Sequence, residues 1–155
     1  DPTAVAHAIW QRVPDAVIDP RAADTVRDLH RRHFAMILAC NTQRPGVLRR
    51  ATLAAAGLGG CFAELVLSSE LGVGKPDRRF YAAVARAAKE TTGWGPAGIC
   101  SVGDTLAKDV TAPMTCGMSA VLVHAPGSRP WPPVPDGVPV IEHLADLSDL
   151  LERLP

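Results

Sequence analysis

The residues best suited to chemistry follow apolar runs of the sequence, in three short polar segments. These segments are "CNTQRPG" (40–46), "GVGKPD" (72–77) and "GDTLAKD" (103–109). The last segment places Asp104 and Asp109 five residues apart, directly after an apolar stretch. Magnesium prefers oxygen ligands and needs only one or two carboxylates from a protein. This segment therefore predicts a magnesium site, and the plainer alternative is that Asp104 caps the following helix.

The other two segments carry groups that suit a phosphate. Asn41 and Thr42 precede a predicted helix, whose N-terminus offers unpaired N–H groups and partial positive charge. Lys75 stands before a proline, which disfavours helical geometry at the lysine and fixes a turn there. Its ammonium could neutralise the charge of a phosphoryl group. The alternatives are that Asn41 or Thr42 is only a helix N-cap, and that Lys75 is only an exposed turn residue.

The elements that must position these residues alternate between short apolar runs and amphipathic stretches. Buried strands are predicted at 34–40, 63–68, 98–102 and 119–125. Helices are predicted at 19–32, 45–59, 76–93 and 106–117, and over most of 139–154. The six prolines of residues 126–139 predict an extended surface loop. This alternation favours an α/β fold with a mostly parallel sheet, in which ligands bind at the strand ends.

The composition of the chain argues against several classes of function. The chain has 155 residues, of which 47% are hydrophobic and 21% charged, as in one ordinary globular domain. Sixteen basic and 16 acidic residues give zero formal charge, so we expect no binding to nucleic acid or to an anionic membrane. No apolar run is long enough to span a bilayer, and the N-terminus does not resemble a signal peptide. The four cysteines form no C-x-x-C pair, so we expect reduced thiols in a cytoplasmic protein.

The order and spacing of the motifs resemble the haloacid dehalogenase (HAD) superfamily of phosphohydrolases, over residues 19 to 154. The resemblance is carried by "ILACNT", "GKPD", "GDTLAKD", "CGMSAVLV" and "VIEHLADLSDLL". It implies a three-layer, Rossmann-like α/β fold, with a mostly parallel sheet flanked by helices, as a single core domain over residues 1–155. It also implies Mg²⁺ as cofactor and a small phosphorylated molecule as substrate.

The same resemblance implies roles for the residues of the first two segments. The family's hydrogen-bonding partner of the phosphoryl group falls on Cys40, and Asn41 and Thr42 would line the same loop. Lys75 would hold the charges of the nucleophile and the phosphate together. The family normally has serine or threonine at the place of Cys40, and a thiol is a weaker hydrogen-bond donor than a hydroxyl. We therefore expect weaker phosphate binding at this position.

In the third segment, the resemblance makes Asp104 a magnesium ligand and Asp109 a residue that orients it without touching the metal. The family's nucleophile belongs to an earlier D-x-D pattern at the end of a first strand. This chain contains no D-x-D. Asp19 follows an apolar trio, but it better fits the turn that opens the next helix. The 155 residues alone are therefore predicted to be inactive.

The strand that carries D-x-D lies in the middle of the family's sheet, so its absence would expose two strand edges. We expect a second copy of the chain, a partner segment or a rearranged strand order to cover them, and residues 1–18 to be the remnant of a cap helix. Two functions stay open. The first is a magnesium-dependent phosphohydrolase that works through an aspartyl-phosphate and has its nucleophile segment outside this chain. The second is a catalytically inactive relative that binds a ligand or a protein.

Overall fold

The strands of the computed structural model, which describes residues 2–13, 15, 17–128 and 133–153, form two parallel sheets. Their bounds are β1 (Ile37–Cys40), β2 (Glu64–Leu67), β3 (Cys100–Gly103), β4 (Ser119–Val123) and β5 (Val140–Ile141). In the first sheet β1 pairs with β2, and Ala39 lies opposite Val66. In the second sheet the order is β3-β4-β5, and Val102 lies opposite Val121. The predicted α/β fold with parallel strands is confirmed.

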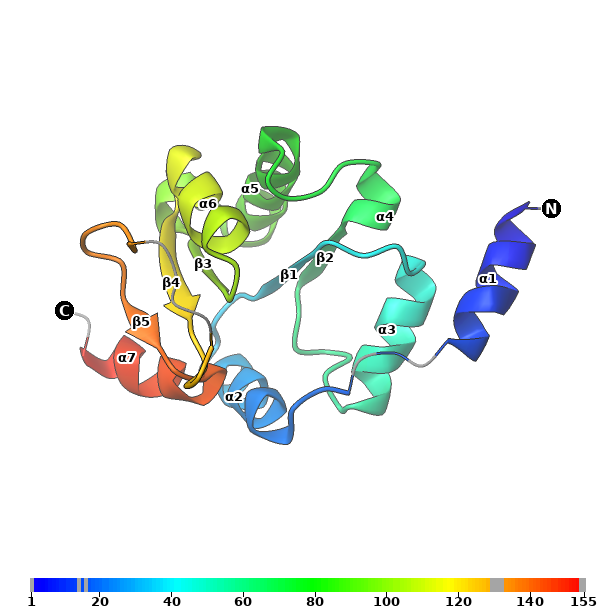
Figure 1. Cartoon of the computed structure of the whole chain (residues 1–155), viewed down its shortest axis with the longest axis horizontal. Helices are drawn as coiled ribbons and strands as arrows, with labels where there is room; N and C mark the ends of the chain where they lie inside the picture. The colour runs from blue at the N-terminus through cyan, green and yellow to red at the C-terminus, as the bar shows by residue number, and fades with distance from the viewer. Residues whose placement is uncertain (1, 14, 16, 129–132, 154–155) are drawn as a thin grey trace.

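Helices cover both sides of these strands (Figure 1). Their bounds are α1 (Pro2–Arg12), α2 (Pro20–Arg31), α3 (Gly46–Ala55), α4 (Ser68–Leu71), α5 (Arg78–Thr92), α6 (Ala112–Thr115) and α7 (Leu147–Arg153). A π-helix (Leu106–Thr111) precedes α6, and two 3₁₀ turns (Pro96–Gly98 and Leu144–Asp146) precede β3 and α7. None of the helices in the described ranges is both long and apolar enough to cross a membrane.

Local signals explain where the main helices begin and end. The carboxylate of Asp19 accepts the N–H groups of Arg21 and Ala22 at the start of α2. Asp77 caps α5 in the same way, and Gly93 ends that helix with a left-handed backbone. Asp19 is therefore a helix cap, as the sequence predicted.

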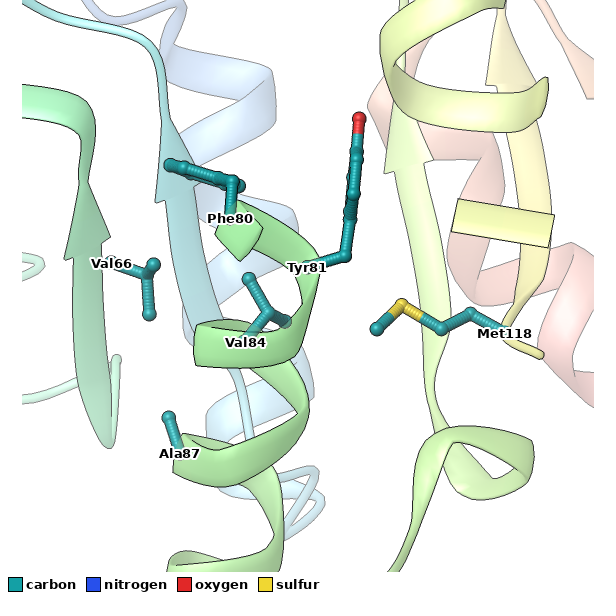
Figure 2. Close-up of a cluster of buried hydrophobic side chains, with 6 residues drawn as sticks. All are labelled: Val66, Phe80, Tyr81, Val84, Ala87 and Met118. Atoms are coloured by element: carbon teal, nitrogen blue, oxygen red, sulfur yellow. The ribbon is translucent and has the colours of Figure 1, made fainter. Parts of the chain in front are cut away.

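Two helices, one on each face, join the two sheets. On one face, Phe80 and Val84 of α5 pack with Val66 of β2 and with Met118, which precedes β4 (Figure 2). On the other face, α2 packs through Val26 in one cluster with Leu38 of β1, and through Leu29 in another with Val121 of β4. Phe80 is fully buried, and burial of such a side chain is worth about 2–3 kcal/mol. The sheets are thus held in place by helices rather than by hydrogen bonds to each other.

The facing strands β1 and β3 are each paired on one side only. β1 is bonded to β2 and β3 to β4, and within the described residues no ladder joins β1 to β3. In Figure 2, α5 lies across the space between these two strands. β1 and β3 therefore each have one unpaired edge in the described part of the chain, and that a D-x-D strand belongs between them stays a prediction.

The closing part of the chain differs from the predicted pattern. Residues 139–154 were expected to be mostly helical, but they begin with β5, which pairs with Leu122 and Val123 of β4. The described part of the proline-rich loop has no helix or strand, as predicted, and residues 129–132 of that loop lie outside the described residues. α4 was also not predicted, because a single helical turn has too few residues for a periodic pattern.

Candidate functional site

Side chains join the loop that follows β1 to the loop that carries Lys75. Asn41, the first residue after β1, donates from Nδ2 to Lys75 O (2.8 Å) and accepts at Oδ1 from Lys75 N–H (2.7 Å). Ser68, which begins α4, accepts at Oγ from Thr42 N–H (2.8 Å) and donates to Thr42 O (3.0 Å). The ends of β1 and β2 are therefore locked to each other and to Lys75.

The side chain of Lys75 spans from this loop to the loop that follows β3. Its Nζ lies 2.6 Å from Asp109 Oδ1, and the two side chains are only 16% and 9% exposed. The second oxygen of Asp109 accepts the N–H of Thr105 at 2.9 Å. Lys75 is therefore a paired, partly buried cation and not the exposed turn lysine of the alternative prediction.

Gly103, the last residue of β3, has no room for a side chain. A Cβ built there would lie only 2.6 Å from both Cβ and Oδ2 of Asp109, because that carboxylate folds back over the strand end. The π-helix that carries Asp109 is tied to α5 by the Tyr81 hydroxyl, which donates to Lys108 O at 2.6 Å. Burial raises the pKa of Tyr81 to about 12, and the negative charge of Asp109 acts in the same direction.

Asp104 is exposed and directly follows β3, five residues before Asp109 in the sequence. Its Oδ1 accepts a hydrogen bond from the Thr105 hydroxyl (3.3 Å). Thr105 itself is the N-cap of the π-helix, and no side chain caps it, so Asp104 does not have the capping role of the alternative prediction. Within the described ranges, no group of three His, Cys, Asp or Glu could hold a metal ion. A single carboxylate does fit magnesium, which keeps several waters and takes oxygens from a phosphate.

Neither Asn41 nor Thr42 caps the start of α3, although the sequence offered both as candidates. Its N-cap is Pro45, and no side chain bonds to its first turn, so Asn41 and Thr42 have other roles. The carboxylate of Glu70 lies against Gly46, the first residue of the helix. A carboxylate near a helix N-terminus is electrostatically favourable. A phosphate at this helix would thus share the first turn with a negative side chain.

Cys40 ends β1 beside a polar hollow of about 520 Å³. Its thiol is half-buried and lies 3.6 Å from Asn41 O, a long and weak contact. The hollow is lined by Asn41, Thr42, Gln43, Ser68, Ser69, Gly72, Val73 and Gly74. None of these residues is charged, and several of them carry hydrogen-bond donors or acceptors. Of the predicted phosphate-binding residues 40–42, Asn41 contacts Lys75, whereas Thr42 forms hydrogen bonds with Ser68 and Arg44.

α1 is attached to the same region by Arg44, which the sequence analysis did not identify. The buried guanidinium donates to Trp10 O (3.1 Å) and Val13 O (3.0 Å). It also forms an ion pair with Asp15 (3.4 Å). In Figure 1, α1 stands at the edge of the molecule, beside α3. The helix predicted within residues 1–18 is present, and its origin as a cap remnant stays a prediction.

The structure thus brings Lys75 and Asp109 into contact and places the exposed Asp104 just before the π-helix that carries Asp109. It also shows supporting residues that the sequence reasoning missed. These are Ser68, Tyr81, Gly103 and Thr105. Of these, only Gly103 had a signal in the sequence, as the glycine directly before the motif aspartate.

Comparison with known proteins gives a family match over most of the chain. A family model for haloacid dehalogenase-like hydrolases matches residues 6–114. A phosphoserine phosphatase of Thermus thermophilus is 36% identical over 131 residues, which are 83% of this chain and 49% of that enzyme. The chain therefore spans about half the length of the curated relative that it matches.

Solved structures agree with this family in fold. A HAD phosphatase from Thermococcus onnurineus has a TM-score of 0.70 at 23% identity, covering 86% of this chain and 58% of its own. A 2-haloacid dehalogenase from Pseudomonas syringae has a TM-score of 0.69 at 26% identity, covering 88% and 54% respectively.

Proposed function

The chain belongs to the haloacid dehalogenase-like hydrolases, and from this premise we propose that it is the core of a magnesium-dependent phosphohydrolase. Its substrate would be a small phosphorylated molecule. The similarity to a phosphoserine phosphatase supports phosphate-ester chemistry. The four cysteines are free thiols, which fits the proposed cytoplasmic location.

One observation carries this proposal: the ammonium of Lys75 is held at Asp109, in the π-helix that begins two residues after Asp104. A cation fixed near the strand ends can stabilise the charge that builds up on a phosphoryl group. Its position is set before substrate arrives, because Asp109 is itself held by Thr105 N–H. An isolated surface lysine would have no such constraint.

The metal assignment rests on Asp104. Its exposed carboxylate would hold Mg²⁺, and Asp109 would support the loop without binding the ion, since both of its oxygens have partners. When bound, the ion would polarise a phosphoryl oxygen. Among the chain's own residues, Lys75 would neutralise charge on the phosphate, and residues 40–42 would supply hydrogen-bond donors.

The nucleophile is proposed to come from outside these 155 residues. In the reaction of this family, a carboxylate oxygen attacks phosphorus, the alcohol leaves with a proton, and water then releases phosphate from the aspartyl-phosphate. Asp19 caps α2 and is not available for this role. An extended segment placed between β1 and β3, parallel to both, would bring its last residue to the edge where Lys75 and Asp104 lie. The unpaired edges of β1 and β3 support this placement.

An inactive, ligand-binding relative is the second candidate. It is favoured by Cys40, whose thiol is a poorer donor than a hydroxyl, and by the absence of D-x-D. A second copy of the chain could then cover the edges of β1 and β3. Light scattering distinguishes the two arrangements, because this one requires a dimer of the 155-residue chain.

The metal-dependent reaction is tested with an aryl phosphate as substrate. The protein assayed consists of these 155 residues extended by the residues that are encoded directly upstream. We expect phosphate release with Mg²⁺ and none in excess chelator. Asp104→Asn should abolish release, because it removes the charge that holds the ion. Asp24→Asn, on the exposed side of α2, is the matched control and should leave release unchanged. Full activity of Asp104→Asn in excess chelator would remove the metal assignment.

A further inference from the structure

Asn41 uses both ends of its carboxamide on one residue, Lys75. Nδ2 donates to Lys75 O at 2.8 Å, and Oδ1 accepts from Lys75 N–H at 2.7 Å. A side chain that pairs with both backbone groups of a residue fixes that residue much as a neighbouring strand does. We propose that Asn41 is a positioning residue, which holds the backbone of Lys75 so that its ammonium reaches Asp109. The catalytic consequence of this role rests on the proposed function, but the role itself does not.

Gly74 gives this contact the space that it needs. A Cβ at Gly74 would lie 2.7 Å from Asn41 Oδ1 and 3.1 Å from both Asn41 Cγ and Ser68 Cβ. The backbone of Gly74 does not have a positive φ, so an alanine could adopt its conformation. The requirement for glycine is therefore one of space, and the atoms that occupy the space belong to Asn41 and Ser68. Substitution of Gly74 becomes a second, independent way to disturb the carboxamide.

The far end of Lys75 is fixed as well. Its Nζ lies 2.6 Å from Asp109 Oδ1, and the side chain is only 16% exposed. The lysine is thus held at the backbone by Asn41 and at the ammonium by Asp109. A long side chain between two fixed points has few rotamers left, and the loss of either point restores its freedom. Without Asn41, the turn would adopt other backbone conformations, and the ammonium would leave Asp109 more often.

The alternative role for Asn41, as a ligand of phosphate alone, predicts something different. The Nδ2 group has two hydrogens, and only one is used on Lys75 O. If Asn41 acted only on phosphate, its substitution would change nothing at Lys75 while phosphate is absent. A measurement on the chain without any substrate therefore separates the two roles.

The chain offers a direct readout, because Lys75, Lys89 and Lys108 are its only lysines. Lys89 and Lys108 are exposed and serve as internal references. The 155-residue chain is treated briefly with formaldehyde and a borane reductant, and peptide mass spectrometry gives the methylation of each lysine. We expect Lys75 to react more slowly than Lys89 in the unsubstituted chain, because its amine is paired and partly buried.

Asn41→Ala and Gly74→Ala should each raise the ratio of Lys75 to Lys89 methylation by about tenfold, as expected from the loss of two hydrogen bonds. The ratio of Lys108 to Lys89 should not change. Asn41→Asp keeps the acceptor for Lys75 N–H but loses the donor to Lys75 O, so its effect should be intermediate. Gly60→Ala is the matched control, since a Cβ there meets nothing within 4 Å.

An unchanged Lys75 to Lys89 ratio in Asn41→Asp and Gly74→Ala would overturn the proposal. Circular dichroism shows whether each variant is folded, and the near-isosteric Asn41→Asp decides the matter if Asn41→Ala unfolds. A rise in the Lys108 ratio together with that of Lys75 would also count against the proposal, because it indicates general loosening. The methylation assay contains no phosphate, so absence of phosphatase activity would defeat the proposed function and leave this result standing.

Discussion

Replacing Asp109 with asparagine should lower the free energy of unfolding by about 2–3 kcal/mol. In the structure, Asp109 Oδ1 lies 2.6 Å from Lys75 Nζ, and Oδ2 accepts Thr105 N–H at 2.9 Å. An asparagine can still accept from Thr105, but its amide group would then point N–H bonds at the ammonium. Removal of one partner of a buried ion pair costs about 3–5 kcal/mol. We expect a smaller loss because the Lys75 side chain keeps 16% exposure and can turn toward water.

The interaction itself is measured by a double-mutant cycle with Lys75→Met. This substitution removes the ammonium, keeps most of the side-chain volume and leaves the Asp109 carboxylate bonded to Thr105. In the double variant neither charge remains, so its loss should be smaller than the sum of the single losses. The coupling free energy should be about 1.5–3 kcal/mol. Urea denaturation followed by circular dichroism, with linear extrapolation to water, gives all four values.

The exposed pair of Asp24 and Arg27 on α2 provides the reference cycle. Its nearest atoms are 2.7 Å apart, against 2.6 Å in the Lys75–Asp109 pair, but the side chains of Asp24 and Arg27 are 74% and 40% exposed. Such surface pairs couple by only about 0.3–0.5 kcal/mol. If the Lys75–Asp109 coupling were no larger than this reference value, the two groups would not form a shielded pair in solution, and the reasoning would be refuted.

Two further predictions concern the residues around this pair. Tyr81 is the chain's one tyrosine, so phenolate absorbance should titrate with a midpoint near pH 12 in the folded protein. The folded state holds this proton more tightly than the unfolded state, in which the tyrosine pKa is about 10. The free energy of unfolding should therefore fall as pH rises from about 10 to 12. A midpoint near pH 10 in the folded protein would contradict the argument that burial raises this pKa. Gly103→Ala should lower the free energy of unfolding by about 2 kcal/mol, because it displaces Asp109. In a chain that already carries Asp109→Asn, it should lower the free energy of unfolding little further. The control Gly60→Ala should change the free energy of unfolding by less than about 0.5 kcal/mol. Full additivity of Gly103→Ala and Asp109→Asn in urea denaturation would show that the two substitutions act separately.

The parts of the fold that depend on local signals could be predicted from the sequence. Asp19 and Asp77 cap helices, and Gly93 ends one, because these residues act on backbone groups a few positions away. The positions of Lys75 and Asp109 at one edge also followed from the sequence. Parallel strands end at the same edge of a sheet, so residues that follow such strands lie close together.

The parts that depend on distant contacts could not be predicted. β5 has only two residues, and it is a strand because it pairs with β4 rather than because of its own pattern. Asn41 bonds to Lys75 across 34 positions of the chain, and no residue type signals such a pairing. The attachment of α1 likewise depends on one buried arginine, Arg44, which reaches the backbone of Trp10 and Val13. Charge, periodicity and turn signals in the sequence do not predict contacts of this kind.

The decisive experiment compares phosphate release from an aryl phosphate by the 155-residue chain and by the same chain extended with the residues encoded directly upstream. We expect no release by the chain alone, magnesium-dependent release by the extended protein, and loss of that release in Lys75→Met. Release by the 155 residues alone would contradict the account, because none of their described side chains is placed as a nucleophile. Undiminished release by the Lys75→Met protein would contradict it equally.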